Sequence, residues 1–256
     1  MTNAQNTPIA LITGGSRGLG RSMALHLAER GVDIVLTYRA AAAEANEVCG
    51  RVRALGRKAA ALALDVTESA SFDAFAKAVA AELERTFGRR QFDYLVNNAG
   101  TSLHASIAET TEAQLDEVYN VHFKAPFLLT QRLLPLIADG GRIINVSSGL
   151  VRMTIPGSAA YGAMKAAVET FTRYAAKELA GRKITANVIA PGAIATDFSG
   201  GMVRDNPEVN KMVTSMTALG RVGQPDDIGG AVAMLLAPES GWINGQRIEA
   251  SGGMGL

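Results

Sequence analysis

The chain has 256 residues, 48% of them hydrophobic, which is enough material for one large α/β domain or two small ones. Its 25 basic residues nearly balance its 24 acidic residues, so the net charge is +1. This balance argues against a nucleic acid or an anionic membrane surface as a partner.

The single cysteine and the length of the hydrophobic runs exclude further classes. Cys49 alone forms neither an intrachain disulfide nor a multi-cysteine metal site, and its helical surroundings predict a thiol that packs in the core. No run reaches the roughly 18 uninterrupted apolar residues of a membrane span. The first residues lack the basic and apolar regions of a signal peptide, so we expect a cytoplasmic protein.

Short apolar runs alternate with helical patterns from one end of the chain to the other. The runs predict strands at 9–13, 33–37, 60–64, 94–97, 142–147, 185–190 and 246–249. Between them lie segments with apolar residues at helical spacing, such as 20–30 and 74–87. Apolar strands that alternate with helices are typical of a parallel sheet covered on both faces. No linker or internal repeat divides the chain, so we predict one doubly wound α/β domain over 1–256.

The segment 193–221 is the most irregular stretch of the chain. It contains Gly200, Gly201 and Pro207, together with methionines at 202, 212 and 216. Long excursions inside compact domains are often lids, and apolar residues on a loop must bury against something. We interpret this segment as a substrate lid; the alternative is a surface loop that carries some apolar side chains.

A glycine-rich segment follows the first predicted strand directly. Gly14, Gly18 and Gly20 allow a tight turn and a close approach of the backbone to a pyrophosphate. The helix expected to start near Leu19 then directs its N–H groups and its dipole at the phosphate charge. Because the pattern stands between a strand and a helix, it indicates a dinucleotide site rather than an ordinary glycine-rich turn.

The end of the second predicted strand favours NADP(H) over NAD(H). An acidic residue about 20 positions beyond the glycines usually binds the ribose 2′-hydroxyl of NAD. Here Asp33 lies at the beginning of the strand and Glu44 lies inside the next helix, so neither is well placed. Arg17 and Arg39 are placed to converge on a 2′-phosphate, although solvated surface arginines would look the same in the sequence.

Seven short motifs, in order, resemble the short-chain dehydrogenase/reductase family over nearly the whole chain. They are TGGSRGLG at 13–20, DV at 65–66, NNAG at 97–100, Asn120 within YNVHF, INVSS at 144–148, YGAMK at 161–165 and NVIAPGAIATD at 187–197. A tyrosine and a lysine at this spacing occur on many helices, but all seven motifs in this order are specific. The resemblance implies a Rossmann-type fold and hydride transfer between a nicotinamide and a carbonyl or alcohol carbon.

The resemblance implies a catalytic tetrad of Asn120, Ser148, Tyr161 and Lys165. Tyr161 is the expected acid/base, and the Lys165 ammonium one turn beyond it, with an oxidised nicotinamide, is expected to lower the tyrosine pKa from about 10. Ser148 is expected to hydrogen-bond the reacting oxygen; it is chosen over Ser147 because the family serine stands thirteen positions before the tyrosine. Asn120 is expected to hold a water molecule that links Lys165 to solvent.

The resemblance also implies cofactor contacts at the carboxyl ends of the strands. Asp65 and Val66 are expected beside the adenine. Pro191 and Gly192 are expected beside the nicotinamide, whose carboxamide Thr196 would bind. The full set, in which Asn97 is expected to be mainly structural, is Gly14, Ser16, Arg17, Gly18, Leu19, Gly20, Arg39, Asp65, Val66, Asn97, Ala99, Gly100, Tyr161, Lys165, Pro191, Gly192, Ile194 and Thr196.

The three histidines do not predict a metal site. His26 lies in the first predicted helix, His104 in a loop and His122 just after Asn120, and no second ligand stands at metal spacing. We expect surface or core positions for all three. Contact of His104 or His122 with the substrate is the alternative.

The C-terminal sequence RIEASGGMGL departs from the family pattern, which often has an acidic residue before the final two glycines. Ala250 and Ser251 stand there instead, which weakens an assignment to any subfamily. Family members are commonly tetramers, so we expect a homotetramer, with the apolar tail as a candidate contact between subunits.

Three functions are compatible with the sequence. The first is a reductase similar to the 3-oxoacyl-[acyl-carrier-protein] reductases, in which Arg132, Arg173 and Lys177 would steer an acidic carrier protein, although solvated helix faces would look the same. The second is a reductase or dehydrogenase of a free ketone, a sugar or a polyol. The third, from another class, is a nucleotide-sensing or scaffold protein without turnover; the four intact tetrad positions argue against it.

Overall fold

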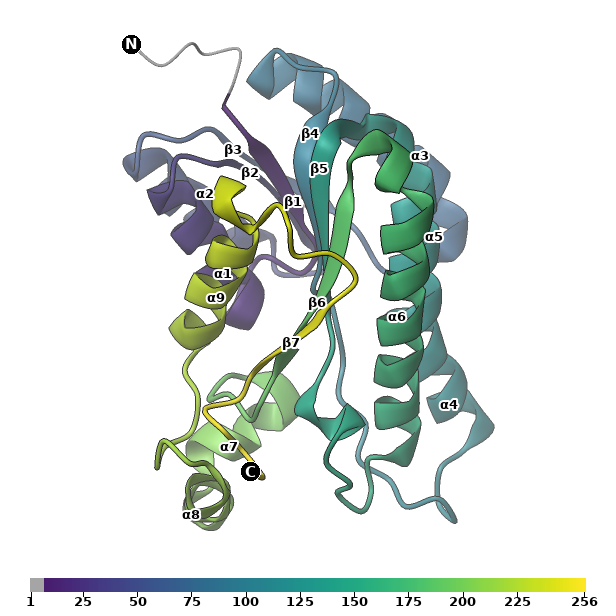
Figure 1. Ribbon diagram of the computed structural model, residues 1–256, viewed down its shortest axis with the longest axis vertical. Coiled ribbons are helices and arrows are strands. Elements are labelled where there is room, and N and C mark those ends of the chain that lie inside the picture. Colours follow the sequence, from purple (N-terminus) through teal and green to yellow (C-terminus); the bar gives the residue numbers. More distant parts are fainter. Residues whose placement is uncertain (1–6) are drawn as a thin grey trace.

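The computed structural model describes residues 7–256, in which a seven-stranded parallel sheet forms the centre (Figure 1). The sheet order is β3-β2-β1-β4-β5-β6-β7, so the predicted fold class is confirmed. All seven predicted strands are present; the largest shift is in β5, which begins at Ile137 instead of 142. The strands are β1 Ile9–Ile12, β2 Asp33–Tyr38, β3 Ala59–Ala63, β4 Phe92–Asn97, β5 Ile137–Val146, β6 Thr185–Pro191 and β7 Arg247–Ala250.

Helices cover both faces of this sheet because the strands are apolar on both sides. Along β1, Ala10 and Ile12 face one layer of helices, whereas Ile9 and Leu11 face the other. The first layer contains α1 Gly18–Glu29, α2 Ala42–Ala54 and α9 Pro225–Leu235 (Figure 1). The second contains α3 Phe72–Glu82, α4 Glu112–Tyr119, α5 Ala125–Leu133 and α6 Ala159–Glu178 (Figure 1).

The strand order produces a crevice at the carboxyl end of β1. After β3 the chain crosses to the other side of β1, so β2 and β4 flank β1 and connections leave their carboxyl ends in opposite directions. Ligands of such sheets bind at this switch point. The predicted glycine-rich segment, the NNAG motif and the end of β2 therefore meet there.

The segment 193–221 is mostly helical, so its description as irregular was wrong. A 3₁₀ turn at Phe198–Gly201 leads into α7 Met202–Asp205 and α8 Pro207–Met216. The sequence signal was Asn206 before Pro207: the Asn206 side chain accepts hydrogen bonds from the N–H groups of the first turn, and proline suits that turn. Both helices lie beyond the carboxyl ends of the strands (Figure 1).

The C-terminal tail packs against this segment within the same chain. The N–H of Leu219 donates to the carbonyl of Gly252, and the N–H of Gly255 donates to the carbonyl of Met216. Met254 is buried in a small cluster with Val213. The tail therefore supports the segment that carries α7 and α8, whereas its contact with another subunit stays a prediction.

Three further expectations concern the described residues. Cys49 is fully buried in α2, as a packing thiol should be. Within 7–256, no helix is long and apolar enough to cross a membrane, and no group of three or more His, Cys, Asp or Glu side chains lies together. The expectation about a signal peptide falls partly on residues 1–6, which lie outside the described residues.

Two neighbouring glycines in α9 have opposite surroundings. Gly229 packs against α1, where a methyl group in place of its hydrogen would lie 2.3 Å from Ser22 Oγ and 2.9 Å from the Ser22 backbone carbon. The Ser22 hydroxyl also donates to Asp226 of α9 at 2.7 Å, so this contact is close and directional. At Gly230, no atom lies within 4 Å of the position that a methyl group would take.

We expect Gly229→Ala and Gly230→Ala to change the free energy of unfolding in opposite directions. Overpacking at Gly229 should lower the stability by about 1–3 kcal/mol. At Gly230 alanine should raise it by up to about 1 kcal/mol, because alanine has the higher helix propensity. Urea unfolding midpoints test this, and equal shifts in the two variants would contradict the close α1–α9 contact.

Candidate active site

Close backbone contacts shape the glycine-rich turn after β1. Gly14 has a φ of +67°, and its N–H donates to Thr37 Oγ1 at 3.1 Å. A methyl group at Gly20 would lie 2.2 Å from the carbonyl oxygen of Gly14, so a larger residue has no room there. The turn is thus held against the end of β2 and leads directly into α1.

The NNAG motif fixes the other side of this turn. Asn98 donates from Nδ2 to the carbonyls of Thr13 at 2.9 Å and Gly14 at 3.1 Å. Thr13 Oγ1 in turn accepts from the N–H groups of Asn98 and Ala99. The sequence analysis did not name Asn98, although its place in the motif was the available signal.

Asn97 points away from the turn and into the protein. It is buried and donates from Nδ2 to Asn145 Oδ1 at 2.7 Å and to Thr130 Oγ1 at 3.2 Å. These bonds join β4 to β5 and α5. The expectation that Asn97 is mainly structural agrees with this geometry.

The start of α1 fits an anionic pyrophosphate. Arg17 precedes the helix in an extended conformation, no side chain caps the first N–H groups, and the first turn carries no acidic residue. Exposed N–H groups and the helix dipole favour a negative charge at such a place. A methyl group at Gly18 would lie 3.8 Å from Thr196, so the turn after β6 borders the same place.

The ends of β2 and β3 bring Arg39 and Asp65 near each other. Burial raises the pKa of Asp65, but hydrogen bonds from Thr67 and the charge of Arg39 outweigh this and lower it. Arg17 and Arg39 are both exposed beside the turn. Two guanidinium groups at this position are available to a phosphate group.

Tyr161, Lys165 and Ser148 come together beyond β5. Tyr161 and Lys165 are buried on one face of α6, with Lys165 Nζ 5.5 Å from the centroid of the tyrosine ring. The lysine ammonium donates to the carbonyl of Val146 at 2.8 Å. Ser148 follows β5 and hydrogen-bonds the Tyr161 hydroxyl. Three of the four expected tetrad side chains are therefore neighbours.

Burial shifts the pKa values in this group. Burial raises the pKa of Tyr161 to about 12, although the hydrogen bond with Ser148 lowers it in part. Burial also lowers the pKa of Lys165 to about 7. The protein groups alone therefore keep Tyr161 protonated near neutral pH. The expected lowering of the tyrosine pKa involves Lys165 together with an oxidised nicotinamide and stays a prediction; the two shifts among the protein groups arise because low polarity disfavours charged forms.

The structure brings His122, and not Asn120, against Tyr161. Asn120 is half-buried at the start of a π-helical turn, Asn120–Lys124, and its side chain makes no hydrogen bond to Tyr161 or Lys165 among residues 7–256. His122 is buried, and its ring centroid lies 4.9 Å from that of Tyr161 in an edge-to-face arrangement. The sequence predicted a surface or core position for His122, with contact to the substrate as the alternative, and did not predict its contact with Tyr161. By contrast, His104 is exposed and His26 is half-buried, both as expected.

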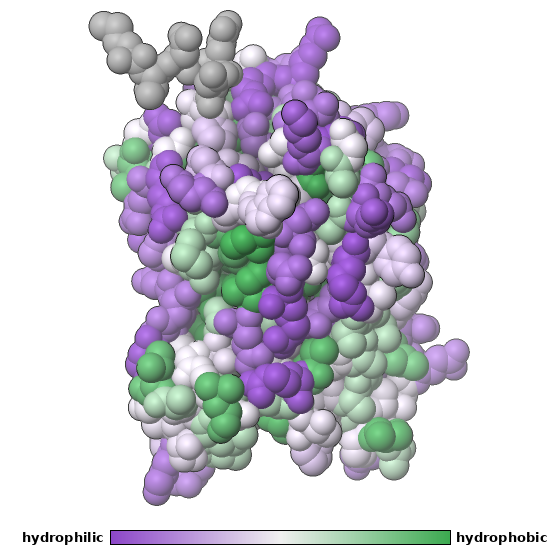
Figure 2. All heavy atoms as spheres, viewed as in Figure 1, coloured by the Kyte–Doolittle hydropathy of each residue, from purple (hydrophilic) through white to green (hydrophobic). Residues whose placement is uncertain are grey.

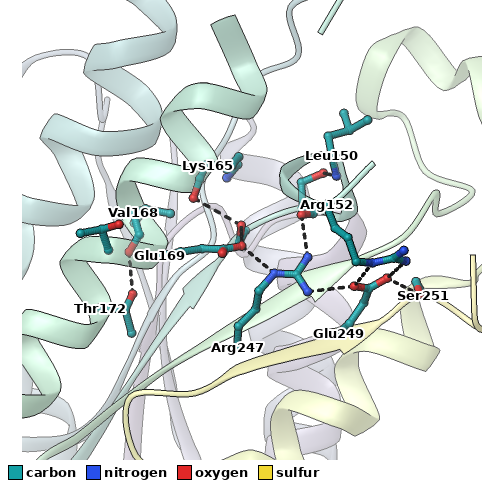
Figure 3. A network of polar contacts seen from close by, with 12 residues as sticks. Leu150, Arg152, Lys165, Val168, Glu169, Thr172, Arg247, Glu249 and Ser251 are labelled. Atoms are coloured by element: carbon teal, nitrogen blue, oxygen red, sulfur yellow. Dashed lines mark hydrogen bonds and ion pairs between the residues drawn. The ribbon is translucent and has the colours of Figure 1, made fainter. Parts of the chain in front are cut away.

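A network of polar side chains supports the backbone of Ser148 (Figure 3). Arg247 of β7 donates to Glu169 at 2.8 Å, to Glu249 at 2.8 Å and to the carbonyl of Ser148 at 3.2 Å. Ser147 donates to the same Glu169 at 2.6 Å, which agrees with the choice of Ser148 as the residue that faces Tyr161. One guanidinium thus joins β7, α6 and the segment after β5.

The same network reaches the C-terminal tail through Glu249 (Figure 3). Glu249 accepts from Arg152 at 2.7 Å and from Ser251 at 2.8 Å. Hydrogen bonds from Arg152, outweighing partial burial, lower the pKa of Glu249 to about 2. Arg152 also donates to the carbonyls of Met254 and Gly255.

Residues after β6 complete the wall of the site. A methyl group at Gly192 would lie 2.9 Å from the Ser251 backbone, so this turn packs tightly against the tail. Ile194 pairs with Gly223 in an isolated parallel bridge. The ring of Phe198 lies 6.3 Å from that of Tyr161, measured between centroids, and brings the segment 193–221 to the group around Tyr161.

Comparisons with known proteins agree with this geometry. A family model described as enoyl-(acyl carrier protein) reductase matches residues 14–255. The hydroxynaphthalene reductase-like protein Arp2 of Metarhizium brunneum is 37% identical over 99% of each chain. The tetrahydroxynaphthalene reductase PfmaG of Pestalotiopsis fici is 38% identical over 96% of this chain and 90% of its own.

Solved structures are similar over almost the whole length. The promiscuous reductase LugOII, which catalyses keto-reduction at C1 in lugdunomycin biosynthesis, has a TM-score of 0.92 and 37% identity over 97% of this chain and 98% of its own. The angucycline C-6 ketoreductase LanV with bound NADP has a TM-score of 0.92 and 35% identity over 97% of this chain and 95% of its own. The chain therefore belongs to the short-chain dehydrogenase/reductase family and is an NAD(P)-dependent oxidoreductase of C=O and CH–OH groups.

Proposed function

We propose that this enzyme reduces a ketone on a fused, phenolic ring system with NADPH. The observation that carries the proposal is the aromatic ring of Phe198, whose centroid lies 6.3 Å from that of Tyr161. The named relatives support it: the enzymes of Metarhizium brunneum and Pestalotiopsis fici are named for hydroxynaphthalenes, and LanV for an angucycline. We also expect, from the family resemblance and the sequence, that the enzyme is a homotetramer in the cytoplasm.

NADP(H) is the cofactor. Arg39 stands at the end of β2 where an NAD enzyme would carry an acidic residue, and Arg17 precedes α1 in the glycine-rich turn. The solved structure of LanV contains bound NADP. The structure of a blue fluorescent protein that is 32% identical to this chain is a complex with NADPH. When bound, the cofactor supplies the hydride that reaches the carbonyl carbon.

In this proposal, Tyr161 is the proton donor of the reduction. Its raised pKa keeps the phenol protonated, which is the form that can give a proton to a carbonyl oxygen. Ser148 hydrogen-bonds the same oxygen and stabilises the charge that develops on it. Lys165, with a pKa of about 7, can lose and regain a proton near neutral pH, and so returns a proton toward Tyr161.

The segment 193–221 supports a flat apolar substrate and serves, in this proposal, as its lid. Phe198, Met202 and Met212 are half-exposed, so their side chains are free to contact a ligand. Aromatic rings stack on flat substrates, and methionine adapts to irregular apolar shapes. Figure 2 shows apolar side chains among polar ones at the end of the molecule where α7 and α8 lie.

A 3-oxoacyl thioester on a carrier protein is the less favoured substrate. Of the three cations that would steer an acidic carrier protein, one is already paired with a carboxylate of this chain and a second donates to a neutral hydroxyl. Arg132 pairs with Asp73 at 2.6 Å, and Arg173 donates to Thr170 at 3.0 Å. A free ring ketone needs no such docking surface.

Oxidation of NADPH with a substrate panel tests the proposed function. The panel contains a hydroxynaphthalenone-type ketone, a simple cyclic ketone, a sugar and a short 3-oxoacyl thioester. We expect kcat/KM for the fused-ring ketone to exceed that for the thioester by about tenfold or more, the size of one or two favourable apolar contacts. Higher turnover of the thioester would restore the carrier-protein substrate, and the same panel with NADH tests the cofactor.

We expect Tyr161→Phe to lose turnover while it keeps NADPH binding. Loss of the proton donor should lower kcat by about 10²–10⁴-fold, because a positioned acid contributes that much. Ring volume and packing against Phe198 are retained, so NADPH affinity, followed by fluorescence, should change little. Near wild-type kcat would exclude Tyr161 as the acid.

We expect Arg39→Asp to shift the cofactor preference toward NADH. A guanidinium hydrogen bond to a phosphate is worth about 1.5–3 kcal/mol, so the NADPH/NADH ratio of kcat/KM should fall by about 10–100-fold. Arg51→Asp is the matched control, since Arg51 is an exposed arginine in the last turn of α2. Equal ratios in the two variants would show that Arg39 does not contact the 2′-phosphate.

A further inference from the structure

His122 occupies the interior position that faces the Tyr161–Lys165 pair. It is 1% exposed and lies in the π-helical turn Asn120–Lys124 between α4 and α5. Successive helical residues are about 100° apart, so residues two positions apart point in very different directions. With His122 against Tyr161, the side chain of Asn120 cannot face the same group.

A backbone hydrogen bond fixes the tautomer of His122. Nε2 lies 2.8 Å from the carbonyl oxygen of Thr101. A carbonyl only accepts, so Nε2 carries the proton and Nδ1 presents a lone pair. Nδ1 is buried and has no hydrogen-bond partner among residues 7–256.

Burial, together with the neighbouring charge of Lys165, keeps the His122 ring neutral. Burial, and then the positive charge of Lys165, lower the pKa of His122 to about 2. Tyr161 and Lys165, both from α6, are the titratable groups that face it. Across the pH range in which enzymes work, Nδ1 is therefore an acceptor, and Lys165 beside it is an ammonium below about pH 7.

A purely structural role accounts for only one of the two ring nitrogens of His122. The bond from Nε2 to the Thr101 carbonyl accounts for one ring nitrogen, but a buried acceptor without a partner is destabilising, so packing alone does not explain Nδ1. Gly100 also leaves room for the ring, since a methyl group there would lie 3.0 Å from His122 Cε1. The acceptor is thus built in at a cost, beside the group that returns protons to Tyr161.

We propose that His122 is a positioning residue for the Tyr161–Lys165 pair, and that its Nδ1 accepts a hydrogen bond from a water molecule bound to the Lys165 ammonium. The inference rests on the proposed function and assigns to His122 the role that the family resemblance implied for Asn120. The ring holds the phenol of Tyr161 by edge-to-face contact. The water keeps Lys165 in contact with solvent during proton return.

Nitrogen NMR of the protein with ¹⁵N-labelled histidine tests the geometry without any substrate. The chain has three histidines, and His26→Gln and His104→Gln variants assign their signals. We expect His122 to show the Nε2–H tautomer and no protonation between about pH 4 and pH 9. An Nδ1–H tautomer, or a midpoint near the ordinary value of about 6.5, would overturn the inference.

Steady-state kinetics test the positioning role with two substitutions at the same place. His122→Phe keeps an aromatic ring but removes the acceptor, whereas His122→Asn retains an acceptor oxygen. We expect kcat to fall by about 10–100-fold in His122→Phe, as small misplacements of reacting groups do, with the KM for NADPH within about twofold. His122→Asn should recover most of kcat.

The pH profile separates positioning from mere packing. Loss of an acceptor disfavours the ammonium form, so the ionisation of Lys165 should shift to lower pH in His122→Phe and less in His122→Asn. Wild-type kcat and pH profile in His122→Phe would overturn the inference, as would an equal loss in Asn120→Ala. Absence of ketone reduction in the wild-type enzyme would contradict the proposed function, while the nitrogen signals would still decide the tautomer of His122.

Discussion

The site depends on a lysine ammonium held in the interior of the protein. Lys165 is 5% exposed, and its Nζ donates to the carbonyl of Val146 at the end of β5. Burial of a charge is costly, so the lysine titrates near neutral pH, and the phenol beside it stays protonated. The acid/base properties of Tyr161 thus follow from where α6 crosses the end of β5.

That crossing is held by the edge strand β7, which is the neighbour of β6 in the sheet. Arg247 of β7 contacts Glu169 of α6 and the carbonyl of Ser148, while Glu249 continues the network to Arg152. The last strand and the tail thereby support a reacting group that is formed by residues about a hundred positions earlier. This explains how a departure from the family pattern near the C-terminus can be compatible with an intact site, because Glu249 provides the acidic group two residues before Ser251.

The fold and the cofactor end of the site could be predicted from sequence because backbone requirements decide them. Glycines 14, 18 and 20 stand where the chain turns or touches itself, and apolar runs mark the central strands such as β1, β2 and β6. Side-chain direction was harder to predict. Asn98 rather than Asn97 bonds the turn, and α7 and α8 were missed in a segment rich in glycine and methionine. Asn97 and Asn98 are identical neighbours in the motif, but their side chains point in different directions.

The π-helical turn at Asn120–Lys124 shows why the side chain that joins Ser148, Tyr161 and Lys165 was the hardest to predict. Such a turn changes the angular position of every residue after it, so helical spacing read from α4 does not carry over to α5. The motif letters favoured an asparagine, while the backbone directs the histidine two residues later toward Tyr161. π-Helical turns often occur at functional sites because they direct one side chain into a place that a regular helix would leave unreachable. In this enzyme that side chain is a neutral imidazole, which offers a lone pair where a second positive charge would compete with Lys165.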